Sequence, residues 1–277
     1  MVCMILNKDQ RDNQLFIVDL FNESEKVAES AELKNLFAQV SWFATKRQAL
    51  SAAAAARPQT IFIDSDVGLQ NYISLCAVKI QTPRTKIHVY EEGIGSYRTD
   101  LVPNPIKKMA FSILGVGRYF GGHFLTEKIH LFEPDSYRLK SQSPQKKTLK
   151  IDVNFSEWIN KNKQLLVSIF SPGFTIRPQE YKTSATVYLS DWNIDWDLIQ
   201  KHKNLNNFYI KLHPHIKKID AKLIGYKQFI PNSLPAEVAI AMLSEQFSQV
   251  TVLHRNSSCI NYISTKKITI VNLPLKL

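Results

Sequence analysis

Short apolar segments alternate with helix-like segments along most of the chain, and this alternation restricts the fold more than any other feature. Short strands separated by helices predict βαβ units and a parallel sheet, which binds ligands at the carboxyl ends of its strands. In the first half we expect strands at Leu15–Leu20, Thr60–Asp64 and Lys86–Tyr90, and helices at Glu23–Phe37, Thr45–Ala56 and Gly68–Ile80.

The alternation is interrupted once. Tyr137–Lys150 is polar and aperiodic, and we interpret it as a linker. Beyond it we expect strands at Leu165–Phe170, Thr186–Leu189, Phe208–Leu212, Val250–Leu253 and Ile268–Val271, and helices at Trp196–His202 and Pro235–Glu245. A further short strand is expected at Val2–Leu6. The sequence therefore predicts an α/β protein with two Rossmann-like domains, residues 1–145 and 146–277, that face a cleft.

The composition of the chain limits which binding partners and which cellular compartment we expect. The 277 residues carry a formal net charge of +11, which favours an anionic partner or only adds solubility. The basic residues form no run with interleaved aromatic residues and no zinc-finger spacing, so we expect no nucleic-acid partner. The three widely spaced cysteines indicate reduced thiols in the cytoplasm. The beginning of the chain lacks a signal-peptide pattern and no window resembles a membrane span, so we expect a soluble or peripheral protein.

Two adjacent carboxylates follow the strand predicted at Lys86–Tyr90. Glu91 and Glu92 leave this strand, and Gly93 and Gly95 permit a tight turn close to a ligand. Neighbouring carboxylates disfavour each other's ionisation, so one of them is suited to act as a base. The alternative is a solvated acidic turn.

A histidine follows the strand predicted at Phe208–Leu212. His213 stands at the carboxyl end of this strand, and Pro214 ends the strand. A histidine in this place can donate a hydrogen bond to a phosphate or protonate a leaving group, and Lys211 adds positive potential. With His215 it could also bind a metal, but no further ligands stand at zinc-like spacing.

Two further places in the second half combine a helix start with polar residues. Ser257 and Ser258 follow the strand predicted at Val250–Leu253, where hydroxyls and backbone N–H groups suit an anion, or where a serine only caps a helix. Glu237 lies in the first turn of the helix that begins at Pro235. It either complements the helix dipole or binds ribose hydroxyls.

In this order, the acid-acid-glycine turn, His-Pro, Pro-x-Glu and Ser-Ser motifs resemble those of the bacterial sialyltransferases and polysialyltransferases. The resemblance runs from about Leu15 to the end of the chain. It implies the fold of two Rossmann-like domains called GT-B and an inverting transfer of sialic acid from CMP-sialic acid to a bacterial surface glycan such as lipooligosaccharide or capsule. It also implies that neither a cofactor nor a metal is required. Relative to the family, the chain is short and its opening strand is abbreviated.

The resemblance also assigns roles to the motif residues. Glu91 is the first choice for the base that deprotonates the acceptor, and Glu92 is the alternative. His213 is the donor or acid at the departing phosphate, with Lys211 and Pro214 beside it. Ser257 and Ser258 hold phosphate oxygens and Glu237 holds the ribose. A transferase for another CMP- or UDP-activated sugar, and a nucleotide-binding protein without turnover, remain alternatives.

The segment Pro105–Leu114 mixes basic and apolar residues. It is typical of an ordinary amphipathic helix, or of one that rests on an anionic membrane beside a lipid-linked acceptor. The second interpretation places the protein at the inner face of the cytoplasmic membrane.

Overall fold

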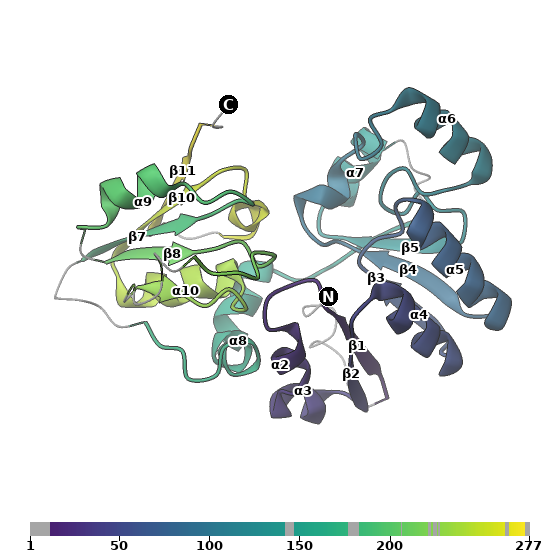
Figure 1. The fold of residues 1–277 in the computed structure, drawn as a ribbon, viewed down its shortest axis with the longest axis horizontal. Coiled ribbons are helices and arrows are strands. Elements are labelled where there is room, and N and C mark those ends of the chain that lie inside the picture. The colour runs from purple at the N-terminus through teal and green to yellow at the C-terminus, as the bar shows by residue number, and fades with distance from the viewer. Residues whose placement is uncertain are drawn as a thin grey trace. The chain divides into compact units, whose positions relative to one another are not determined.

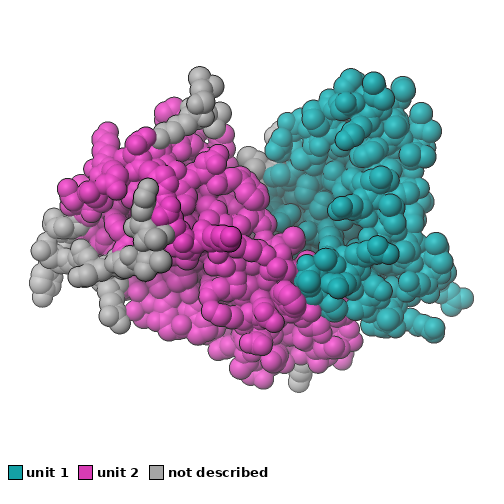
Figure 2. Space-filling model, viewed as in Figure 1, with its two compact units in different colours: residues 1–9, 43–153 teal, residues 10–42, 154–277 magenta. Residues whose placement is uncertain are grey.

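The chain divides into two compact units in the computed structural model (Figure 2). The structure describes residues 12–141, 147–176, 183–205, 207–220, 223, 226, 228–263 and 266–274. The described part of unit 1 runs from Phe43 to Val153. Unit 2 combines the described residues before Phe43 with the chain from Asn154 onward.

Unit 1 is built on a four-stranded sheet in the order β3-β4-β5-β6, with all neighbouring strands parallel (Figure 1). Its strands are β3 (Thr60–Ile63), β4 (Lys86–Tyr90), β5 (Thr126–Leu131) and β6 (Thr148–Lys150). Its helices are α4 (Lys46–Ala55), α5 (Leu69–Gln81), the 3₁₀ helix η1 (Ile94–Tyr97), α6 (Pro105–Leu114) and α7 (Pro134–Ser141). Because the strands are parallel, the residues that follow β3, β4 and β5 meet at one edge of the sheet.

The core of unit 1 arises from the two-residue alternation of its strands. One face of the sheet consists of buried aliphatic side chains: Ile61, Ile63, Ile87, Val89, Ile129 and Leu131. Helix α4 begins with a capping box, in which Thr45 and Gln48 satisfy each other's backbone N–H groups, and it packs against α5.

Unit 2 contains a five-stranded parallel sheet in the order β11-β10-β7-β8-β9. Its strands are β7 (Ser184–Leu189), β8 (Phe208–Lys211), β9 (Phe229–Ile230), β10 (Gln249–His254) and β11 (Ile268–Asn272). Its helices are α8 (Phe155–Phe170), α9 (Trp196–His202), α10 (Ala236–Gln246) and the 3₁₀ helix η4 (Ser258–Tyr262). The same unit includes the paired strands β1 (Gln14–Val18) and β2 (Gln39–Phe43, which ends at the first residue of unit 1) and the helices α2 (Ser24–Ala28) and α3 (Ala31–Leu36).

Helices α9 and α10 cover opposite faces of this sheet (Figure 1). On one face, Ile199 of α9 packs against Phe208 and Ile210 of β8. On the other face, Tyr209 of β8 contacts Phe247, which ends α10. Alternate residues of β8 therefore belong to different sides of the core.

The α/β class is the predicted one, since both main sheets are parallel and are connected through helices. The strand predicted at Leu165–Phe170 was wrong, because these residues form the last part of α8. Their burial follows a helical spacing, with Leu166, Val167 and Ile169 buried on the same helix as Trp158. A short apolar run does not by itself distinguish a strand from a buried helix.

Two further predictions differ from the structure. The expected helix Glu23–Phe37 is two helices, because Ser30 caps the start of α3. The expected linker Tyr137–Lys150 begins inside α7 and ends in β6. The domain boundary at residues 145 and 146 and the strand Val2–Leu6 lie outside the described residues, whereas the unit boundary falls between Val153 and Asn154. Within the described residues, the helices are too short or too polar to span a bilayer.

Candidate functional site

Glu91 lies directly after β4 in unit 1, and its side chain is buried. Its Oε2 atom accepts hydrogen bonds from the Tyr97 hydroxyl and, at 2.8 Å, from the backbone N–H of Phe132. Phe132 follows the last residue of β5. Glu91 therefore fastens the loop after β4 to the end of β5, which is a structural use of its carboxylate.

Glu92 is exposed at the same edge of the sheet, but the surrounding protein still removes part of the hydration of its carboxyl group. This partial loss of hydration raises the pKa of the carboxyl group, the nearby Asp64 carboxylate raises it further, and Lys46 lowers it. A carboxylate with a raised pKa is a stronger base. Of the two glutamates, Glu92 is thus the one whose surroundings suit proton abstraction.

The pair Asp64 and Lys46 is part of this edge, and the sequence did not single it out. The Lys46 ammonium donates to Asp64 Oδ1 and, at 2.8 Å, to the backbone carbonyl of Ser65. Glu91 was selected from the sequence because it follows a predicted strand. Asp64 follows β3 in the same way, so the same criterion would have selected it. Lys46 begins α4, far away in sequence, and carries no comparable signal.

Only one of the two predicted glycines is required by the backbone. Gly93 has a φ of 139°, which side chains other than glycine rarely adopt. Gly95 lies in η1 without such a φ, and a Cβ atom added to it would meet no atom within 4 Å. Gly93 therefore makes the turn possible that brings Tyr97 to Glu91.

In unit 2, the chain order across the sheet reverses at β7. The strands β8 and β9 extend the sheet on one side of β7, whereas β10 and β11 extend it on the other. Ligands of open parallel sheets bind beside such a reversal, at the carboxyl ends of the strands. Ser190 follows β7, His213 lies two residues after β8, and Ser257 lies three residues after β10.

His213 is held in one orientation at this edge. Its backbone N–H donates to Ser190 Oγ at 2.9 Å, and its Nδ1 accepts the backbone N–H of His215 at 3.3 Å. Because Nδ1 accepts, the proton of the neutral ring is on Nε2. Burial first, and then the neighbouring His215 and Lys211, lower the pKa of His213 to about 4. At neutral pH His213 is therefore an uncharged hydrogen-bond donor.

Trp192 forms an aromatic stack with the two histidines of this loop. Its ring lies 4.7 Å from that of His213 and 5.0 Å from that of His215, and the residue is 66% exposed. Pro214 is exposed, and its carbonyl accepts the backbone N–H of Asn22 at 2.9 Å. Sequence reasoning missed Ser190 and Trp192, although both follow a predicted strand.

Lys211 is buried in the core rather than at the surface. Its ammonium donates to the carbonyls of Leu212 at 2.8 Å and Asn232 at 3.2 Å. These carbonyls belong to the loop that carries His213 and to the loop that leads to α10. Burial lowers the pKa of Lys211 to about 8, against the attraction of Glu237. Lys211 thus joins two loops from inside and is not placed to touch a phosphate.

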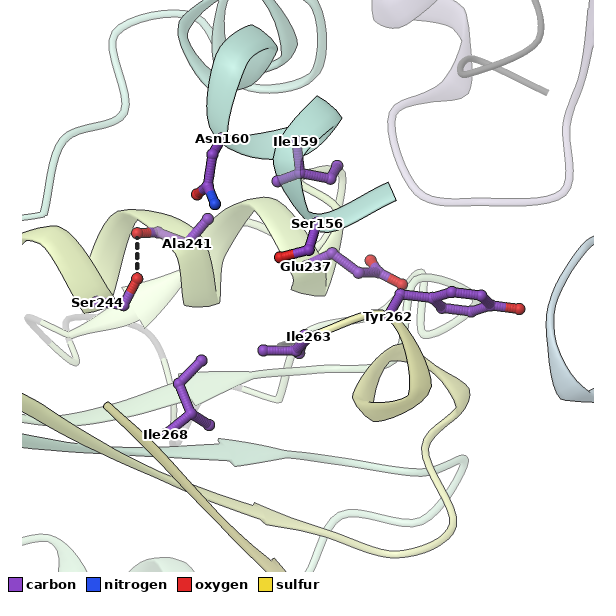
Figure 3. Close-up of a pocket in the computed structure, with 9 residues that line it drawn as sticks. All are labelled: Ser156, Ile159, Asn160, Glu237, Ala241, Ser244, Tyr262, Ile263 and Ile268. Carbon is purple, nitrogen blue, oxygen red and sulfur yellow. Dashed lines mark hydrogen bonds between the residues drawn. The ribbon is translucent and has the colours of Figure 1, made fainter. Parts of the chain in front are cut away.

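Glu237 lies in the first turn of α10, as predicted, beside a small hollow (Figure 3). The hollow has a volume of about 20 Å³, enough for a water molecule. It is lined by Ser156, Ile159, Asn160, Glu237, Ala241, Ser244, Tyr262, Ile263 and Ile268. Burial raises the pKa of Glu237, and the Lys211 ammonium opposes this rise. Lys211, Glu237 and Cys259 interact electrostatically, because each changes the pKa of another.

Ser257 and Ser258 are half-buried at the start of η4. The backbone N–H of Ser257 donates to Nδ1 of the buried His254 at 3.2 Å, and its hydroxyl lies 3.1 Å from Cys259 Sγ. The Ser257 side chain makes no capping hydrogen bond to η4. Because the two serines follow β10 as His213 follows β8, they lie at the same edge of the sheet as His213.

The buried position of Lys211 predicts a pH-dependent stability. Its pKa of about 8 lies below the unfolded value of about 10.4, so between these values the unfolded state binds more protons and stability rises with pH. From pH 8 to 9 Lys211 contributes a gain of about 1 kcal/mol. The raised pKa of Cys259 has the opposite effect over the same range, because the unfolded thiol, with a pKa of about 8.5, loses its proton there while the folded thiol keeps it. Chemical denaturation at pH 8 and 9 should therefore give a change in stability that is about 1 kcal/mol more favourable in the wild type than in Lys211→Met; equal changes would contradict the role of Lys211.

The structure divides the predicted site residues between the units. Glu91, Glu92, Gly93 and Gly95 lie together in unit 1. The second set gathers at the carboxyl edge of the sheet in unit 2: Lys211, His213, Pro214, Glu237, Ser257 and Ser258. Among the residues that the structure describes, no three His, Cys, Asp or Glu side chains are grouped as metal ligands would be.

Comparison with known proteins identifies the fold. No family model matches the sequence, and no curated protein matches it significantly. Among solved structures, an α/β-galactoside α-2,3-sialyltransferase from Photobacterium phosphoreum is 12% identical, with a TM-score of 0.55 over 97% of this chain and 84% of that one. The wall teichoic acid polymerase TagF, soaked with CDPG, is 12% identical, with a TM-score of 0.50 over 94% of this chain and 70% of that one. The chain shares the fold of these glycosyltransferases.

Proposed function

We propose that the protein is an inverting glycosyltransferase that moves sialic acid from CMP-sialic acid to a bacterial surface glycan. The arrangement of His213 is the observation that carries this proposal, because a neutral donor stands beside the sheet reversal of a transferase fold. The acid-acid-glycine, His-Pro, Pro-x-Glu and Ser-Ser motifs support it, since each of them follows a strand or begins a helix in the units that contain the two parallel sheets.

The reaction that we propose breaks the bond between the anomeric carbon and the CMP phosphate oxygen, and the electron pair stays with the phosphate. The acceptor hydroxyl attacks the anomeric carbon from the opposite face, forms the new glycosidic bond and loses its proton. We assign this proton to Glu92, because Glu91 already accepts two hydrogen bonds inside the protein. Glu91 becomes a positioning residue, which revises the first choice made from sequence.

The leaving phosphate gains negative charge and needs donors that are already oriented. We assign His213 Nε2–H and the hydroxyls of Ser257 and Ser258 to its oxygens, and Glu237 to the ribose hydroxyls. With a pKa of about 4, His213 stabilises the phosphate as a hydrogen-bond donor and is rarely protonated at neutral pH. Pro214 shapes the loop, and Lys211 stabilises it from the core.

The acceptor that we propose is a lipooligosaccharide or capsular glycan, which a lipid can carry, and the compartment is the cytoplasm at the inner face of its membrane. The proposal includes neither a required metal nor another cofactor. A donor with a different activated group is the second candidate. It is favoured by the similarity to TagF, which was soaked with CDPG.

Donor assays test the proposal and separate the candidates. Hydrolysis and transfer should be measured with CMP-sialic acid, CDP-glycerol and UDP-sugars, with a panel of glycan acceptors and with EDTA present. Thermal shifts with the same nucleotides report binding without turnover, because a ligand of the native state raises its melting temperature. We expect sialic acid release from CMP-sialic acid only. Turnover of another donor would favour the second candidate, and binding of CMP without any turnover would contradict catalysis.

A further inference from the structure

Helix α6 in unit 1 exposes an apolar face. Ile106, Met109 and Ile113 are 73%, 63% and 78% exposed, and their spacing of three and four residues places them on the same side of the helix. No side chain of α6 is buried. The helix lies at one end of unit 1, apart from α4 (Figure 1).

A helix of this kind needs a surface to pack on. The Asn104 side chain caps its first turn, Pro105 begins it, and Gly115 ends it with a φ of 69°. Caps fix the two ends, but an isolated helix of fewer than about 12 residues is marginal in water. The described residues provide α6 with no buried face, so its stability is expected to increase when its apolar face is covered.

The exposed apolar side chains continue from α6 toward α5. Phe124 is exposed, and its ring lies 6.0 Å from that of Tyr72 in α5. A Cβ atom at Gly115, the residue that ends α6, would lie 3.1 Å from the Phe124 ring. We define the apolar surface as six exposed apolar residues: Leu69 and Ile73 of α5, Ile106, Met109 and Ile113 of α6, and Phe124.

The segments that form the apolar surface carry basic residues and no acidic ones. The sequence between Asp100 and Glu127 contains Lys107, Lys108 and Arg118 and no carboxylate. Lys107 and Lys108 are exposed and follow Ile106 directly on α6. Helix α5 also lacks acidic residues. The partner of this surface is therefore expected to be both apolar and anionic.

We propose that the apolar surface docks onto an anionic lipid bilayer, with α6 lying in the interface. The apolar side chains enter the boundary between headgroups and acyl chains, while Lys107 and Lys108 contact the lipid phosphates. A symmetric contact with a second copy fits less well, because it would bring the same cations together without a carboxylate between them. This docking does not depend on the transferase activity proposed above.

Vesicle co-sedimentation tests the docking. We expect the protein to bind vesicles of phosphatidylcholine with 30% phosphatidylglycerol, to bind pure phosphatidylcholine about tenfold less, and to be partly released by salt. A Met109→Trp variant should in addition show a blue-shifted emission with anionic vesicles, because residue 109 enters an apolar medium. Adsorption by charge alone would leave the emission unchanged and would contradict insertion of α6.

Matched variants locate the surface. Ile106→Ser with Ile113→Ser, and separately Lys107→Glu with Lys108→Glu, should each lower the vesicle partition coefficient at least about tenfold. Leu205→Ser, and Lys161→Glu with Lys201→Glu, alter exposed residues of unit 2 and should leave it unchanged. Transfer to a soluble acceptor without vesicles should be the same in all variants, which separates this proposal from the proposed function.

Two results would overturn the docking. The first is absence of binding to anionic vesicles at low salt. The second is a dimer in light-scattering chromatography that the two isoleucine substitutions convert to a monomer while vesicle binding persists, which would assign the apolar surface to a second copy of the chain.

Discussion

Glu92→Gln is expected to lower the turnover of sialic acid transfer by at least about a hundredfold, the usual scale for the loss of a general base. The donor affinity and the melting temperature should change little, because the side chain is exposed and makes no structural contact comparable to that of Glu91. Steady-state kinetics with CMP-sialic acid and thermal melting measure both. Glu127→Gln, another exposed carboxylate of unit 1, serves as the control and should retain full activity.

The pH dependence gives a second test of the same base. Activity should fall at acid pH as Glu92 becomes protonated. The charged residues beside Glu92 set the pH at which this fall occurs. Asp64 raises the pKa of Glu92 and Lys46 lowers it. Asp64→Asn should therefore move the acid limb of kcat/KM to lower pH, and Lys46→Met should move it to higher pH. Shifts in the opposite directions, or none, would exclude Glu92 as the group that titrates.

Glu91 should respond differently. Glu91→Gln weakens the hydrogen bonds to Tyr97 and Phe132, and we expect a loss of stability of about 1–3 kcal/mol, the range for a disturbed buried polar group. Tyr97→Phe removes one of the same contacts and should have a similar but smaller effect. Neither variant should move the acid limb. A shift of that limb in Glu91→Gln, with stability unchanged, would return the role of base to Glu91.

Local sequence patterns predicted many helices and strands because the apolar spacing within such a segment and the polar residues at its ends favour that structure. The strand Lys86–Tyr90 and the helix Trp196–His202 have the predicted bounds, since each has a clear apolar pattern and a polar boundary. The strand predicted at Leu165–Phe170 failed because its apolar run is also the buried side of a long helix. The grouping of β1 with unit 2 was not predictable, since it depends on contacts between distant segments, such as Lys217 with Asp19.

The candidate site was predictable to the level of the residue that follows a strand, and not to the direction of its side chain. Glu91 and Glu92 are adjacent, so they point to different sides of the chain, and only the fold decides which one is buried. Lys211 likewise ends a strand, and the fold places its side chain in the core and not at the surface. Lys46 has no sequence signal, because the end of β3 brings Asp64 to it from 18 residues away.

His213 decides the donor half of the mechanism, and two substitutions separate its possible roles. His213→Ala should lower turnover at least about a hundredfold, because the leaving phosphate loses a donor that the loop holds in a fixed orientation, which a mobile water molecule does not replace. His213→Gln presents an amide N–H near the position of Nε2 and should recover part of this loss. If His213 instead acted as a proton-donating acid, the glutamine variant would be as inactive as the alanine variant.

The same distinction appears in the pH profile. With a pKa of about 4, His213 stays neutral from pH 5 to 8, so it should produce no basic limb in that range. A basic limb near pH 6.5 that disappears in His213→Gln would show that the protonated ring is required. His215→Ala is the matched control: its side chain stacks on His213, but the contact to Nδ1 comes from its backbone N–H, which the substitution retains. We therefore expect His215→Ala to preserve most of the activity that His213→Ala removes.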